Sequence, residues 1–172
     1  MSLHTLDIGR DRIRDYVKQD YDVWSNLEFE EDSFNSFDYD FDLLPNIKEY
    51  IKESLKEQGY RLRNKNQNQN RVSPSVPAGK FNIQKHNSSV EEHVDDACLF
   101  GIFVLEIVYT TIPTLAGYDR YPALHYYIGR SKMVERLRIG NVVVFNPKRP
   151  HSLIHYGNSP TMLLFSCEKI RK

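Results

Sequence analysis

The chain has 172 residues, which is enough for one domain, or for one domain with an appended element. It has 23 basic and 23 acidic residues, so its formal net charge is zero; this argues against duplex nucleic acid as a partner, because such binders usually carry a basic excess. No apolar stretch is long enough to span a membrane and no signal sequence opens the chain, so we expect no membrane association.

Cysteine usage bears on the compartment. The chain has only two cysteines, Cys98 and Cys167. They are too few for a disulfide framework and they lack zinc-finger spacing. We therefore expect a reducing, cytoplasmic setting.

The first half of the chain predicts one clear helix between two less regular segments. In residues 28–42 acidic and aromatic side chains alternate, and we expect an extended lid or edge segment whose aromatic rings lie on the main body. The alternative is a partly disordered acidic arm. Residues 43–59 predict a helix, because apolar residues fall on one stripe, Pro45 suits a first turn and Gly59 suits the end. The polar residues 64–77 predict a loop and a second candidate lid.

From Lys80 onward the pattern changes to short β-branched or aromatic runs separated by turn residues. These runs predict strands at 81–84, 99–111, 124–128, 133–137, 142–145, 152–156 and 162–167. Strands at this spacing, without helices between them, favour an antiparallel sandwich or barrel. We expect a mostly β protein: residues 1–79 form an N-terminal helical and lid region, and residues 80–172 form the β core of a single compact domain.

Three residues in this β region have the chemistry of a metal site. His93 and Asp95 are two positions apart, so on a strand their side chains share one face. His151 follows a turn glycine, a buried strand and a proline-containing turn, and it could supply the third metal ligand. Two histidines and one carboxylate, with the other metal positions open, are typical of non-haem Fe(II) oxygenases. An exposed loop of acidic residues around His93 is the simpler alternative.

The segments that carry these residues resemble those of the Fe(II)- and 2-oxoglutarate-dependent dioxygenase superfamily. Residues 82–96, NIQKHNSSVEEHVDD, resemble its strand, turn and HxD loop, and residues 140–151, GNVVVFNPKRPH, resemble its distal-histidine segment. The resemblance covers about residues 81–165. It implies a double-stranded β-helix (jelly roll) with the N-terminal helices packed on one face. It also implies that His93, Asp95 and His151 are the catalytic iron ligands, 2-oxoglutarate is the co-substrate and the reaction is hydroxylation or demethylation.

The sequence departs from this family at the last strand. Members usually carry a basic residue about ten positions beyond the distal histidine, where it pairs with the far carboxylate of 2-oxoglutarate; here residues 159–163 contain no arginine or lysine. A buried carboxylate needs such a partner. Arg130 and Arg149 are the main candidates for a substitute, and the sequence does not choose between them. We also predict that His86 contacts the co-substrate or substrate and that His155 lies behind the metal site.

Two other functions stay open at this point. A cupin-like metal protein that does not use 2-oxoglutarate fits the missing arginine, although the chain lacks the close His-x-His pair of metal cupins. A non-catalytic jelly-roll binding module would make the histidines incidental. The substrate, either a small molecule or a protein side chain, and the oligomeric state are not determined by the sequence.

Overall fold

The computed structural model describes residues 19–28, 38–63, 76–85, 89–95, 99–109, 122–154 and 158–170. Its helical elements are α2 (Tyr21–Trp24), the short 3-10 helix η1 (Phe41–Leu43) and α3 (Pro45–Glu57). Its strands are β1 (Asp38–Asp40), β2 (Tyr60–Leu62), β3 (Lys80–Lys85), β4 (Val90–His93), β5 (Phe100–Tyr109), β6 (Ala123–Ile128), β7 (Ser131–Arg136), β8 (Val142–Phe145), β9 (His151–Ile154) and β10 (Asn158–Lys169).

The strands form two antiparallel sheets. The six-stranded sheet has the order β1-β3-β10-β5-β8, with β2 paired to β10, and the four-stranded sheet has the order β4-β9-β6-β7. Apart from the β6–β7 hairpin, successive strands from β3 to β10 alternate between the two sheets. This is the strand order of a jelly roll, so the predicted double-stranded β-helix is confirmed.

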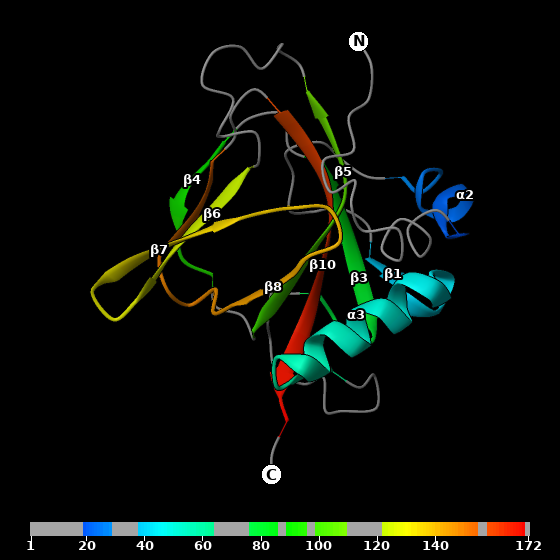
Figure 1. Ribbon diagram of the computed structural model, residues 1–172, viewed down its shortest axis with the longest axis horizontal. Coiled ribbons are helices and arrows are strands. Elements are labelled where there is room, and N and C mark those ends of the chain that lie inside the picture. The colour runs from blue at the N-terminus through cyan, green and yellow to red at the C-terminus, as the bar shows by residue number, and fades with distance from the viewer. Residues whose placement is uncertain are drawn as a thin grey trace.

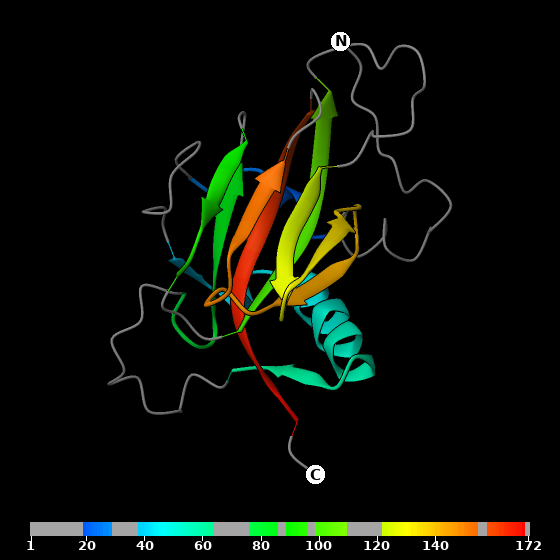
Figure 2. The ribbon, with the colours of Figure 1, turned by 90° about the vertical axis from the view of Figure 1, so that its left-hand side faces the viewer.

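Figure 1 shows three layers: the four-stranded sheet, the six-stranded sheet and helix α3. Because side chains alternate along a strand, the six-stranded sheet has an apolar core on each of its faces. Phe81, Phe103 and Leu163 pack under the helix, whereas Ile102, Val104 and Met162 face the other sheet. Figure 2, turned by 90°, looks onto the four-stranded sheet that closes this second core.

Helix α3 confirms the prediction for residues 43–59. It spans Pro45–Glu57, buries Ile47, Ile51 and Leu55, and is followed by Gly59 with φ of 87°. The strands at 81–84, 142–145 and the other predicted positions are also present, with ends shifted by a few residues. The structure adds β1, β2 and β4, which the sequence did not reveal as strands.

The end of the acidic and aromatic segment lies on the main body. Asp38–Asp40 pairs with β3, and Phe41 is fully buried in the core under the helix. Residues 29–37 and 64–75 are outside the described residues, so the rest of both candidate lids stays a prediction. No helix among the described residues is both long and apolar enough to cross a membrane.

Helix α3 begins without a local side-chain cap, and Asp20 supplies one from a distant part of the chain. Leu44 at the cap position has no suitable side chain. The carboxylate of Asp20, itself buried, accepts hydrogen bonds from the Ile47 backbone N–H at 2.8 Å and from the Asn46 side chain at 2.8 Å. Asp20 therefore joins α2 to α3 and satisfies a backbone donor in the first helical turn.

We expect Asp20→Ala to lower the free energy of unfolding by about 1–3 kcal/mol, because it leaves the Ile47 N–H buried without its acceptor. Urea unfolding followed by circular dichroism measures the change. Asp22→Ala removes an exposed acidic residue of the same short helix and should change stability little. Equal loss in the two variants would contradict the capping role.

Glu106, a polar residue on the six-stranded sheet, should make stability depend on pH. Thr161 of β10 pairs with Lys85 on one side and Glu106 on the other, so these three residues form a row across the sheet. Burial raises the pKa of the Glu106 carboxyl, and the charge of Lys85 opposes that shift. A carboxyl whose pKa is raised in the folded state stabilises the protein most at low pH, and this stability is lost as pH rises through the folded-state pKa.

Glu106→Gln should therefore raise the melting temperature at pH 7, and the gain should shrink as pH falls towards about 3, where the glutamate is protonated in both states. Differential scanning calorimetry across this range measures the effect. Glu57→Gln, at an exposed position at the end of α3, is the control and should show little pH-dependent difference. A gain that is constant with pH would rule out ionisation of Glu106 as its cause.

Candidate metal centre

The turn between β8 and β9 is built by local sequence. Asn146 accepts hydrogen bonds from two residues ahead of it: its side-chain oxygen from the Lys148 N–H at 3.0 Å, and its carbonyl from the Arg149 N–H at 3.1 Å. Pro147, the second residue of this turn, has a fixed φ that suits the position. The turn is therefore held in one conformation before it reaches β9.

Carbonyl groups of this turn position two of the three candidate ligands. The Asp95 N–H donates to the Pro147 carbonyl at 2.8 Å, which holds the segment after β4 against the turn. The His151 Nδ1 lies 2.8 Å from the Arg149 carbonyl. The pairing of β4 with β9 then places His93 directly opposite His151. Segments far apart in the sequence are thus tied together by backbone contacts.

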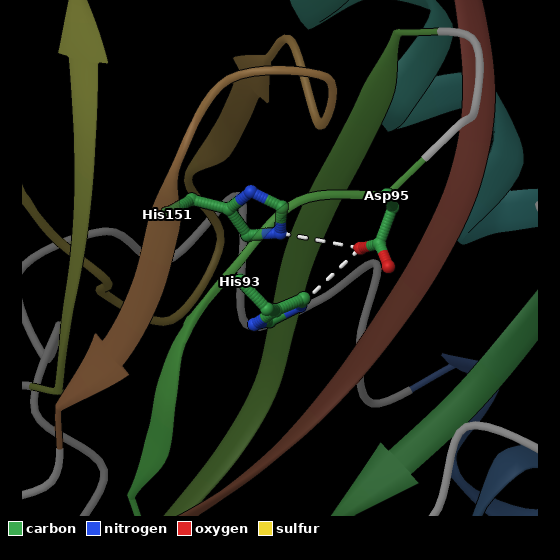
Figure 3. A group of neighbouring side chains, drawn as sticks. All are labelled: His93, Asp95 and His151. Atoms are coloured by element: carbon green, nitrogen blue, oxygen red, sulfur yellow. Dashed lines mark ion pairs between the residues drawn. The ribbon is translucent and has the colours of Figure 1, made fainter.

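Figure 3 shows the resulting group of His93, Asp95 and His151. The Oδ2 atom of Asp95 lies 3.3 Å from the Nε2 atom of each histidine, and the centroids of the two imidazole rings are 4.3 Å apart. One potential ligand atom from each residue lies within 4.8 Å of the others. Ligands bound at about 2.1 Å to one ion are separated by about 3–4 Å, so this spacing fits a single metal ion.

The hydrogen bonds of the two rings indicate which nitrogen faces the site. The Nδ1 of His93 is 2.8 Å from the Glu91 carbonyl, and that of His151 is 2.8 Å from the Arg149 carbonyl. A carbonyl can only accept, so each Nδ1 carries the proton and a neutral ring directs its Nε2 lone pair at the Asp95 carboxylate. Three acceptor atoms that face one another need a cation or protons between them. Carbonyl-anchored histidines of this kind are typical of metal ligands.

Burial favours the neutral form of one ring. His151 is only 5% exposed and packs against Phe145, with ring centroids 5.1 Å apart. This burial lowers the pKa of the His151 imidazole and outweighs the opposite effects of the Arg149 carbonyl and Asp95. A neutral imidazole is the form that binds a metal ion.

The group lies at one side of a small cavity between the two sheets. The cavity has a volume of about 40 Å³. Apart from the three candidate ligands, its polar lining residues are Gln84 and Ser152. The apolar lining residues are Val90, Phe100, Ile102, Leu124, Phe145, Leu153, Met162 and Leu164. Among the described residues, no lysine or arginine lines this cavity.

The other predicted site residues do not join this group within the described part of the chain. Arg130 is exposed in the turn between β6 and β7, and Arg149 is exposed in the turn before β9. Neither side chain lines the cavity. His86 and His155 lie outside the described residues, so their predicted roles stay predictions.

Two residues near the site were not predicted from the sequence. Tyr126 of β6 pairs with His151, so Tyr126, His151 and His93 form one row across three strands. Gln84 is buried on β3 and reaches the cavity from the opposite sheet. The alternation of apolar residues in β6 and β3 could have placed both side chains on inward faces, but only the pairing of the strands shows that they lie near the histidines.

Comparisons with known proteins assign no family to this chain. No protein-family model matches the chain, and no curated protein matches it. Among solved structures, protein NMB1881 from Neisseria meningitidis is 13% identical, with a TM-score of 0.32, and the match covers 53% of this chain and 73% of that one. A cupin-2 domain protein from Shewanella frigidimarina is 12% identical, with a TM-score of 0.33, and the match covers 61% of this chain and 84% of that one.

Proposed function

We propose that the protein is a mononuclear non-haem iron oxygenase in which His93, Asp95 and His151 hold the ferrous ion. The observation that carries this proposal is the convergence of two Nε2 atoms on one Asp95 oxygen, each at 3.3 Å, with both rings fixed by backbone carbonyls. Two neutral imidazoles and one carboxylate leave other coordination positions open. When bound there, ferrous iron supplies activation of dioxygen for oxidation of a substrate.

The chain's own residues fix the ligands and keep water away from part of the site. The Pro147 and Arg149 carbonyls hold Asp95 and His151, as a site of defined geometry requires. The apolar walls of the cavity, including Phe145 and Leu153, exclude water beside the imidazoles. A substrate would approach from the side of the triad that is partly exposed, because His93 and Asp95 are less buried than His151.

The first candidate for the co-substrate is 2-oxoglutarate, as the sequence resemblance implies. Its far carboxylate would need a cation, and Arg149 is the better placed of the two predicted arginines because it precedes His151 by two residues in the turn that holds both Asp95 and His151. In the second candidate function, the protein is a cupin-like oxygenase that needs no 2-oxoglutarate as co-substrate. The cavity favours this second candidate, because its described lining has no lysine or arginine to pair with a dicarboxylate.

The experiment has two parts. Protein purified without chelator is analysed for metal, and Fe(II) is then added under anaerobic conditions with and without 2-oxoglutarate. A visible charge-transfer band that needs 2-oxoglutarate, followed by succinate formation in air, supports the first candidate. Stoichiometric iron with oxygen consumption but no succinate supports the second. Absence of iron binding in wild-type protein would overturn the proposal as a whole.

If 2-oxoglutarate is the co-substrate, Arg149→Ala should raise the concentration needed for half-maximal succinate formation by about tenfold or more, because it removes the charge partner of a carboxylate. Arg130→Ala is the matched control, since Arg130 lies in the exposed turn of the β6–β7 hairpin. Iron content measured on both variants separates loss of the co-substrate from damage to the metal site. An unchanged requirement in Arg149→Ala would exclude this arginine as the partner.

A further inference from the structure

Strand β7 is an open edge of the four-stranded sheet. Along its whole length, Ser131–Arg136 pairs with β6, and no described strand pairs with its other side. Figure 1 shows the β6–β7 hairpin projecting from the left of the molecule. Residues 131–135 are all exposed, and the pairing with β6 has no register shift. Soluble proteins usually protect such an edge with proline, a bulge, a covering segment or charged side chains. Among the described residues, β7 has only the last of these, Lys132, Glu135 and Arg136, so the pattern of these charges decides which segment can pair with the edge.

The two faces of this strand differ in charge. Because side chains alternate, Lys132, Val134 and Arg136 share one face, and Ser131, Met133 and Glu135 share the other. On the first face β6 adds His125, which pairs with Val134. The positive charges of Lys132 and Arg136 reach this histidine and, with burial, lower the pKa of its ring. Within the described parts of β6 and β7, this face carries no carboxylate.

Apolar side chains are exposed at the same edge. Met133 is 37% exposed and Val134 is 48% exposed, one on each face of the strand. A strand added beside β7 would cover both side chains and pair with the backbone groups of the open edge. Edge addition of this kind takes its affinity from main-chain hydrogen bonds and its specificity from alternate side chains.

We propose that the β7 edge binds an extended acidic segment of a partner protein, which adds as a fifth strand of the sheet. Lys132 and Arg136 are four residues apart on one face, so the segment carries two acidic residues four positions apart, with an apolar residue midway between them opposite Val134. On the other face an apolar or small residue covers Met133. This inference is independent of the metal ion.

A second copy of the chain fits this edge less well. A two-fold axis that pairs two β7 strands antiparallel must run normal to the sheet, which keeps the basic faces of both copies on the same side. With Val134 on the axis, Lys132 lies directly opposite Arg136 of the other copy. With Met133 on the axis, the basic residues of both copies still lie on one face as close neighbours. Like charges at such positions destabilise a strand pair.

The test uses a fluorescent peptide with the pattern Thr-Glu-Thr-Val-Thr-Glu-Thr, a second peptide with lysine in place of glutamate, and a third with alternate backbone nitrogens methylated. We expect the full chain to bind the acidic peptide at least about tenfold more tightly than the lysine peptide in anisotropy titrations. Methylation should abolish binding, because it removes strand pairing but keeps the charges. The acidic peptide should also slow hydrogen exchange in β7.

Charge reversal supplies the matched variant. Lys132→Glu, at an exposed position, should keep the melting temperature of the wild type and remove the preference for the acidic over the basic peptide, because Arg136 then remains as one cation beside one anion. Equal binding of methylated and unmethylated peptides would overturn strand addition. Equal binding of the acidic and basic peptides by the wild type, or an unchanged preference in Lys132→Glu, would overturn the proposed partner chemistry. Sedimentation of the free protein as a dimer that Met133→Lys dissociates would show that the edge binds a second copy instead.

Discussion

Replacement of Asp95 by alanine should weaken Fe(II) binding by about 100-fold or more while the protein stays folded. Loss of a residue that only orients a metal ligand already costs about 10–100-fold in affinity, so loss of a ligand should cost at least as much. The fold should survive because the Asp95 side chain is partly exposed and contributes nothing to either apolar core. Its backbone N–H, which binds the Pro147 carbonyl, is retained in the variant.

Equilibrium dialysis against Fe(II), with a melting curve of the metal-free protein, measures both properties. Glu92→Ala is a suitable control, because it removes an exposed acidic residue of the neighbouring strand β4 and should leave iron affinity unchanged. If Asp95→Ala binds iron like the wild type, the carboxylate is not a ligand. If it unfolds with unchanged metal content, Asp95 has a structural role instead.

The part of the candidate site that sequence predicts is the part defined by local spacing. His93 and Asp95 are separated by one residue, and His151 follows a turn built by Asn146 and Pro147, so each half can be read from a few neighbouring residues. That the two halves meet depends on the pairing of β4 with β9 and on the hydrogen bond from Asp95 to the Pro147 carbonyl. Backbone contacts of this kind leave no mark on residue types.

In the fold, too, the elements defined by local sequence could be predicted, and those that depend on pairing between distant segments could not. Helix α3 and strand β8 could be predicted closely, because one has a regular apolar stripe and the other is a continuous apolar run. Strands β1 and β2 have three residues each, which is too short for alternation to stand out. Strand β10 begins before its predicted start and includes Pro160, a residue that normally argues against the interior of a sheet. There the neighbouring bulge opposite Thr161 already interrupts regular pairing.

Gly101 is the one glycine within the described strands, and its replacement should be costly. It lies in β5 directly opposite Phe165 of β10. A Cβ atom added to Gly101 would overlap the side-chain ring of Phe165. That ring is fully buried and packs against Phe41, with centroids 5.6 Å apart, so it cannot move aside freely. The conflict is steric, since the backbone of Gly101 does not have a positive φ.

We expect Gly101→Ala to lower the free energy of unfolding by about 1–3 kcal/mol, the usual cost of an overpacked core, and the melting temperature by about 2–4 °C for each kcal/mol. Phe165→Leu alone should also destabilise, because it leaves a cavity beside Phe41. The double variant should lose less than the sum of the two single losses, since the smaller side chain makes room for the new methyl group. Strict additivity in denaturant unfolding would mean that the β5–β10 pair relieves the clash by moving its backbone.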